Sequence, residues 1–250
     1  VGALPFFLPM LWLRYPGPLP LHFWGLLVFV GFCHLGGGIL LVRALSSSDL
    51  SLCIPMGAFT PVFLLFTAPI LTGDLPSTAG IFGALFVFLG SYLLNLPEMK
   101  DGIFAPFRAL FREPGVRIML FLAFLWSITC CVDRIAVKRY DLIFWGSAEV
   151  TFISLLFLPV LFFNYSFSPV PDRSQVGRLF LIGALNAASF WGYLGALLYA
   201  PVYYVICVKR LSILFSILLG RFVFHEVGLG DRLLGGLFML TGVAIISLYG

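Results

Sequence analysis

The chain has 250 residues, of which 61% are hydrophobic and 10% are charged, and its formal net charge is +4. Its mean hydropathy of +1.07 excludes a water-soluble globular protein, because so few polar residues cannot cover a surface that faces water. The composition therefore predicts an integral membrane protein that lies in the lipid bilayer. Nucleic-acid binding is not expected, since no basic cluster with interleaved aromatic residues occurs outside one loop.

The chain begins with an apolar stretch, residues 1–13, that is too short to cross a bilayer. Within it Phe6–Leu11 resembles Leu156–Leu161, which lies near the end of a later apolar run. We interpret the stretch as a partial span. We also expect about one and a half further spans to precede Val1 in the natural protein, because span 116–137 has no counterpart in the first half.

Eight apolar runs have about the 20 residues that a helix needs to cross the hydrocarbon core. They are residues 21–42, 50–72, 76–96, 116–137, 141–163, 177–199, 201–223 and 229–249. The runs are apolar on every face, which predicts helices and an all-α integral membrane protein. Three prolines, Pro55, Pro61 and Pro69, are expected to bend span 50–72, since proline removes a backbone donor.

The only long connection, residues 97–115, separates a first half, residues 1–96, from a second half, residues 116–250. Its apolar and basic positions are Phe104, Phe107, Leu110, Phe111, Arg108 and Arg112. They fit a short amphipathic helix in the headgroup layer. A solvated linker with incidental aromatic residues fits equally well.

The two halves repeat one another. The run Thr60–Asp74 returns as Ser212–Glu226, with an acid at each end, and Gly83 and Gly90 match Gly235 and Gly242 at the same offset. Such a duplicated apolar unit is typical of membrane transporters.

These residues also resemble the EamA-type family of the drug/metabolite transporter superfamily. The likeness rests on Ala44-Leu45 before a turn, Ser212–Ser216, Glu226 at a helix end, Gly235 and Gly242, and on the runs Trp126–Val137 and Tyr204–Ser212. The resemblance implies ten spans in two inverted five-span repeats, here truncated at the N-terminus, and a small-molecule substrate. Glu149 departs from the pattern, since some relatives have a basic residue in that span, so an anion-binding role does not carry over.

An odd number of spans in each repeat forces the second copy to insert upside down, which is the basis of alternating access. Lysines and arginines are more numerous on the side of the central loop, which the positive-inside rule places in the cytoplasm. The family resemblance instead implies cytoplasmic termini and an outside loop. We expect the family arrangement, in the cytoplasmic membrane of a prokaryote.

Charged residues inside the spans are the first site candidates, because a charge at the bilayer centre costs about 2.5–3.5 kcal/mol. On span 201–223 Lys209, Ser212 and Ser216 share one helix face, and on span 116–137 Trp126, Thr129 and Asp133 do the same. Because Asp133 and Lys209 fall at similar depth, they form either a structural salt bridge or a proton carrier with a switchable partner. Arg210 is expected to face the partner span or to reach the interface.

Four other polar residues complete the proposed pathway: Asn186, Ser189 and Tyr193 on one face of span 177–199, and His34 beside Gly36–Gly38. The acid Glu149 in span 141–163 is a further candidate. Each has a structural alternative, since small polar residues often bond neighbouring helices and a lone histidine is often a packing residue.

The five cysteines fall in apolar spans without metal-ligand spacing, and no phosphate-binding loop or metalloprotease motif occurs. No metal and no cofactor are therefore expected. The favoured function is a secondary transporter that exports a small metabolite or drug-like solute at the expense of a proton gradient, without enzymatic activity. The alternative is a membrane enzyme or scaffold that retains the transporter fold. The sequence leaves open whether the protein functions as a single chain or as a homodimer.

Overall fold

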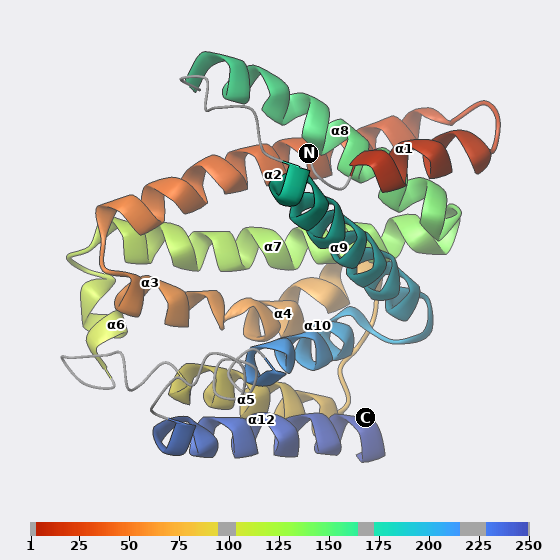
Figure 1. Ribbon diagram of the computed structural model, residues 1–250. Coiled ribbons are helices and arrows are strands. Elements are labelled where there is room, and N and C mark those ends of the chain that lie inside the picture. The colour runs from red at the N-terminus through yellow and green to blue at the C-terminus, as the bar shows by residue number, and fades with distance from the viewer. Residues whose placement is uncertain (1–3, 95–103, 165–172, 216–228, 250) are drawn as a thin grey trace. The chain divides into compact units, whose positions relative to one another are not determined.

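The computed structural model describes residues 4–94, 104–164, 173–215 and 229–249, and every regular element in these ranges is a helix (Figure 1). The helices are α1 (Leu4–Leu13), α2 (Leu21–Ser47), α3 (Leu50–Gly57), α4 (Thr60–Thr72), α5 (Thr78–Leu93), α6 (Ala105–Ala109), α7 (Pro114–Arg139), α8 (Leu142–Asn164), α9 (Arg173–Tyr199), α10 (Val202–Arg210) and α12 (Leu229–Tyr249). The all-α prediction is confirmed for these ranges.

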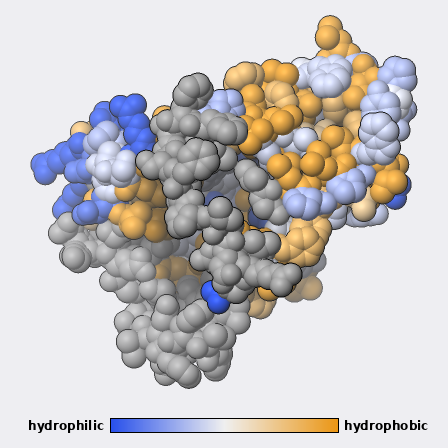
Figure 2. Space-filling view, turned by 45° about the horizontal axis from the view of Figure 1, so that its top comes forward, coloured by the Kyte–Doolittle hydropathy of each residue, from blue (hydrophilic) through white to orange (hydrophobic). Residues whose placement is uncertain are grey.

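Among the residues that the structure describes, five segments are long and apolar enough to cross a membrane: Leu21–Ser47, Leu52–Thr72, Pro114–Arg139, Leu142–Pro159 and Gly177–Tyr199. Shorter apolar helices cover Leu4–Leu13, Thr78–Leu93 and Leu234–Tyr249. The surface is apolar as well: Trp12 is 86% exposed and Leu21 is 88% exposed, and hydrophobic residues cover much of the described surface in sight in Figure 2. Such a surface belongs in lipid, so the protein is an integral, multi-pass membrane protein.

The chain divides into two compact units, which are treated separately below. Unit 1 comprises Val1–Gly37 and Val132–Tyr199, and unit 2 comprises Gly38–Cys131 and Ala200–Gly250. Helices α2 and α7 each contribute to both units. Each unit therefore combines segments from both halves of the sequence.

Proline interrupts the predicted span 50–72. Helix α3 ends at Gly57 and α4 begins at Thr60, and between them the Phe59 N–H donates to the Met56 carbonyl at 3.2 Å, a tight turn. Pro61 stands in the first turn of α4, where its missing N–H leaves no bond unmade. At the position of the predicted bend the structure has a two-residue interruption, Ala58 and Phe59, both of which keep right-handed helical dihedral angles.

A second break was not predicted, because span 201–223 reads as one continuous apolar run. Helix α10 ends at Arg210, and the Leu211 N–H turns back to the Val208 carbonyl at 3.0 Å. In the register of the duplication, Arg210 and Leu211 correspond to Ala58 and Phe59. Both copies of the repeat are therefore interrupted at the same place.

Helices α5 and α12 of unit 2 approach closely through four glycines. A Cβ on Gly90 would lie 2.5 Å from the Gly235 carbonyl oxygen, and a Cβ on Gly83 would lie 2.8 Å from that of Gly242. The two helices run antiparallel, because Gly83 contacts Gly242 and Gly90 contacts Gly235. In the duplication Gly83 corresponds to Gly235 and Gly90 to Gly242, so the two contacts are equivalent. Small residues of this kind let helix backbones come together in membranes.

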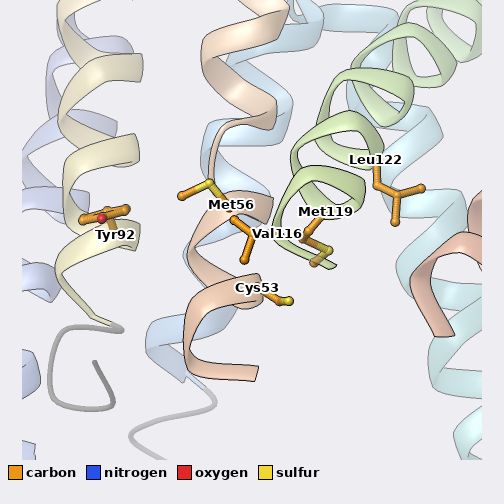
Figure 3. Packing of buried hydrophobic residues seen from close by; sticks show 6 residues of the cluster. All are labelled: Cys53, Met56, Tyr92, Val116, Met119 and Leu122. Atoms are coloured by element: carbon orange, nitrogen blue, oxygen red, sulfur yellow. The ribbon is translucent and has the colours of Figure 1, made fainter. Parts of the chain in front are cut away.

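One apolar cluster in the core of unit 2 joins three helices (Figure 3). Its buried residues are Cys53 and Met56 of α3, Tyr92 of α5, and Val116, Met119 and Leu122 of α7. Phe107 and Leu110, which belong to the central loop, pack against this cluster. The loop thus holds the short helix α6, and its apolar side is fixed to the core.

Candidate functional site: an acidic cluster in unit 1

The site is built on the second half of α7. Pro114 fits the first turn of this helix, and Lys138 and Arg139 lie in the last turn, where cations favour the helix dipole. Helical spacing sets Trp126, Thr129 and Asp133 on one face of α7. The Thr129 hydroxyl donates to the Trp126 carbonyl at 3.1 Å, so it is satisfied within its own helix.

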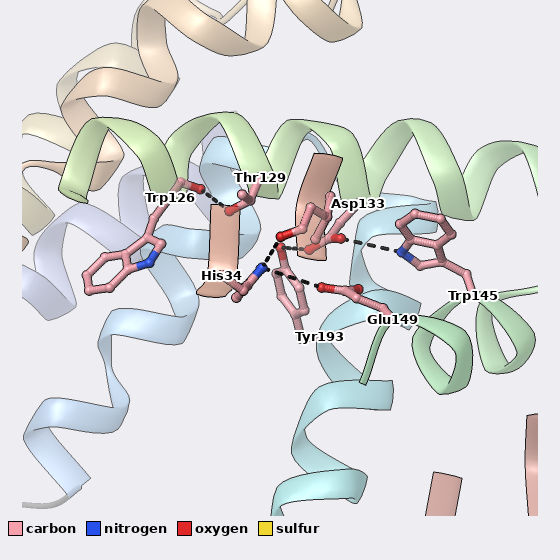
Figure 4. A network of polar contacts seen from close by, with 8 residues as sticks. His34, Trp126, Thr129, Asp133, Trp145, Glu149 and Tyr193 are labelled. Atoms are coloured by element: carbon pink, nitrogen blue, oxygen red, sulfur yellow. Dashed lines mark hydrogen bonds and ion pairs between the residues drawn. The ribbon is translucent and has the colours of Figure 1, made fainter. Parts of the chain in front are cut away.

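Asp133 is 4% exposed and is held by residues from α8 and α9 (Figure 4). The Tyr193 hydroxyl donates to Oδ2 at 3.2 Å, and the Trp145 indole N–H donates to Oδ1 at 3.4 Å. Glu149 of α8 lies beside Asp133 in the same cluster (Figure 4). Three helices of unit 1 thus meet at this one carboxyl group.

The contact between Asp133 and Glu149 determines the chemistry of the cluster. Asp133 is 4% exposed and Glu149 is 1% exposed. Two ionised carboxylates that are buried side by side repel each other, and a proton on one of them removes this repulsion.

His34 of α2 places a base beside the pair. Its Nδ1 lies 3.0 Å from the Val30 carbonyl and 4.0 Å from Glu149 Oε1. Because a carbonyl can only accept, Nδ1 is the donor in the bond to Val30. The ring is 34% exposed, so His34 is more accessible than either acid.

Arg134, adjacent to Asp133 in sequence, is also buried but interacts with a different element. Its Nη1 atom donates to the Leu197 carbonyl in the last turn of α9. Carbonyls at a helix C-terminus lack intrahelical partners and carry partial negative charge. The arginine thus fixes the end of α9, the helix that supplies Tyr193.

An apolar cavity of about 550 Å³ lies in unit 1 between α1, α2 and α8. Aromatic side chains line it, among them Trp12, Trp24 and Phe23. The Thr151 hydroxyl, also in the lining, is buried without a hydrogen-bond partner among the described residues. Phe23 packs edge-on against Trp145, with ring centroids 5.7 Å apart, so Trp145 stands between this cavity and Asp133.

The predicted residues on span 201–223 belong to unit 2. Lys209 and Ser212 are exposed, and Ser216 lies outside the described residues. Since Asp133 belongs to unit 1, the proposed pairing of Asp133 with Lys209 stays a prediction. Arg210 faces the partner span as expected: its Nη2 atom donates to the Gly57 carbonyl at 2.6 Å and to the Thr60 hydroxyl at 3.2 Å.

The structure brings four of the predicted residues together, namely Asp133, Glu149, His34 and Tyr193. Asn186 and Ser189 are exposed on α9, and Trp126 packs against the apolar cluster of unit 2. Sequence reasoning missed Trp145. Its spacing of four from Glu149 was the available signal, because it places both side chains on one face of α8.

The described side chains do not make this cluster a metal site, since no group of three His, Cys, Asp or Glu residues among them could hold an ion. Acids buried in a bundle of apolar helices are instead the kind of group that marks solute and ion pathways in membrane proteins.

The comparisons identify the family. The sequence profile of the EamA-like transporter family matches residues 113–248, more than half of the chain. The chain therefore belongs to the EamA-like transporter family, within the drug/metabolite transporter superfamily, and the resemblance noted from the sequence is confirmed. No curated protein matches the chain. A solved structure described only as "Crystal structure of protein" aligns with 100% of this chain and 86% of its own, at a TM-score of 0.79 and 17% identity. That similarity concerns the fold alone.

Proposed function

We propose that this protein is a proton-coupled secondary transporter that exports a small metabolite or drug-like solute by alternating access. Membership of a transporter family supports the class of function. The observation that carries the coupling is the burial of two acids, Asp133 and Glu149, in one cluster inside the helix bundle, because adjacent buried carboxyl groups favour a shared proton. Protonation of the pair on one side of the membrane and release on the other would drive solute against its gradient.

The proposal includes two inverted copies of a five-span unit. Two observations support it: the helix breaks fall at Ala58–Phe59 and at Leu211, which are equivalent in the duplication, and the glycine contacts between α5 and α12 are reciprocal. A two-fold relation between the copies gives such paired contacts. Interrupted helices are also common around the substrate sites of repeat transporters.

The apolar cavity of unit 1 is proposed to receive the apolar part of the solute, and the Thr151 hydroxyl to bond a polar group on it. Trp145 would link solute to proton, because its ring packs against Phe23 of the cavity and its N–H bonds Asp133. Lys209 remains the proposed partner of Asp133 in a second conformation, and Trp126, Asn186 and Ser189 remain proposed pathway residues.

The test uses purified protein in vesicles with an imposed pH gradient and a mixture of candidate solutes, and measures solute accumulation. Asp133→Asn and Glu149→Gln should each abolish accumulation driven by the gradient. Exchange between labelled and unlabelled solute should persist, because the amides mimic the protonated acids. Lys209→Ala tests the second conformation, and it should slow net transport more than exchange.

Asp141→Asn is the matched control. Asp141 accepts the Phe144 N–H at 2.9 Å at the start of α8, and asparagine serves equally well as a helix cap. This variant should transport like the wild type. Accumulation that survives both Asp133→Asn and Glu149→Gln would remove the proton role and leave a structural acid pair.

A further inference from the structure

The central loop holds a second cavity in the part of unit 2 that the structure describes. It measures about 720 Å³ and is lined by Phe104, Phe107, Arg108, Phe111 and Arg112. We propose that this basic aromatic pocket binds the headgroup of an anionic phospholipid, with the two guanidinium groups on the phosphate and the phenyl rings in the apolar layer beneath it.

The backbone of the pocket is anchored, so the pocket does not depend on a bound lipid to form. The Phe107 ring packs on Phe59, with centroids 5.9 Å apart, and on Tyr92, at 5.7 Å. Downstream, the Ser48 hydroxyl donates to Glu113 at 2.8 Å and accepts the Gly115 N–H at 3.1 Å. These contacts fix both ends of the segment to the core of unit 2.

The charges of the pocket favour an anion. Arg108 lies in α6 and Arg112 lies four residues further along the chain, and both side chains are exposed. The acid next to them in sequence, Glu113, is engaged by Ser48. Paired guanidinium groups bind phosphate oxygens with good geometry, since each offers parallel N–H donors.

Position and size favour a lipid over a free phosphate. The pocket ends at Arg112, two residues before α7 begins a membrane span at Pro114. Phe104 is 66% exposed and Phe111 is 88% exposed, as expected of rings that lie at a bilayer interface. A volume of about 720 Å³ suits a drug-sized group rather than a single phosphate ion.

The experiment measures lipid retained by the purified protein by native mass spectrometry, after reconstitution in mixtures of phosphatidylglycerol and phosphatidylcholine. The wild type should retain phosphatidylglycerol selectively. Arg108→Gln and Arg112→Gln should each reduce retention about tenfold, the effect of one charged hydrogen bond. Phe111→Ala should weaken retention as well, because a lipid also contacts the ring.

Arg117→Gln is the matched control, since Arg117 is exposed in the first turn of α7 but does not line the pocket. It should retain lipid like the wild type. An equal loss in Arg117→Gln would overturn the proposal in favour of diffuse attraction to the membrane. Inorganic phosphate that displaces the lipid at millimolar concentration, with Phe111→Ala unchanged, would also overturn it. Solute transport plays no part in these readouts, so the result does not depend on the proposed function.

Discussion

The guanidinium of Arg210 donates to the carbonyl oxygen of Gly57 at 2.6 Å. Arg210 ends α10 at the break in the second copy, and Gly57 ends α3 at the break in the first. The arginine of one interruption therefore adds a charged donor at the other interruption, where the Gly57 carbonyl also accepts the Thr60 hydroxyl at 3.0 Å. It also adds positive charge at the negative end of α3.

Replacement of Arg210 by glutamine is expected to destabilise the protein by about 1.5–3 kcal/mol, the usual value of a hydrogen bond to a charged group. Thermal unfolding in detergent should show a midpoint several degrees lower. Lys209→Gln, at an exposed neighbouring position, is the control and should leave the midpoint nearly unchanged. Equal unfolding midpoints for Arg210→Gln and Lys209→Gln would show that the bond from Arg210 to Gly57 does not stabilise the protein.

Trp145→Phe should separate proton coupling from solute binding. The phenyl ring keeps most of the packing against Phe23, whereas the indole N–H that donates to Asp133 is lost. Without that donor Asp133 loses one of its hydrogen bonds, so solute accumulation driven by a pH gradient should fall. Exchange of labelled for unlabelled solute, which needs no gradient, should change little.

Tyr193→Phe removes the other neutral donor to Asp133 and should also reduce accumulation driven by the pH gradient. The change deletes one hydroxyl and leaves the ring, so folding should be affected by only about 1 kcal/mol. Accumulation equal to that of the wild type in both variants would argue against any role of these two donors in proton coupling.

Gly90→Ala and Gly235→Ala should be strongly destabilising, because the new Cβ meets the backbone of the facing helix at 2.5 Å and 2.7 Å. Overpacking of this kind typically costs about 1–3 kcal/mol. Gly192→Ala is the control: this helical glycine has no neighbour within 4 Å of a Cβ, and alanine favours the helix. Unfolding of the three variants in detergent measures the difference, and similar stabilities would contradict the close approach.

How far the sequence could predict the fold is clear from the two helix breaks. The first break lies between Pro55 and Pro61, so the local sequence predicts it. The second falls at Leu211, between Tyr204 and Ser212, a run without proline or glycine. There the interruption coincides with the bond from Arg210 to Gly57. These residues are far apart in the sequence, so local helix propensities cannot predict the contact.

The candidate site was likewise predicted only in part from the sequence. Helical periodicity placed Asp133 on a common face with Trp126 and Thr129, and the hydrophobic run around Glu149 made that acid a candidate. The expectation that opposite charges pair led instead to Lys209, whereas the contacts that the structure gives Asp133 come from Tyr193, Trp145 and Glu149. A sequence shows that a buried acid needs partners, but only packing decides whether neutral donors or a cation supply them.

The reciprocal glycine contacts between α5 and α12 have a practical use. If the two copies exchange conformations, the contact of Gly83 with Gly242 takes the place of the contact of Gly235 with Gly90, so the interface looks the same before and after the exchange. Spectroscopic labels beside Gly83 and Gly242 would therefore keep a constant separation throughout the transport cycle. Such a pair of labels would serve as a fixed reference, against which the movement of every other helix in the protein could be measured.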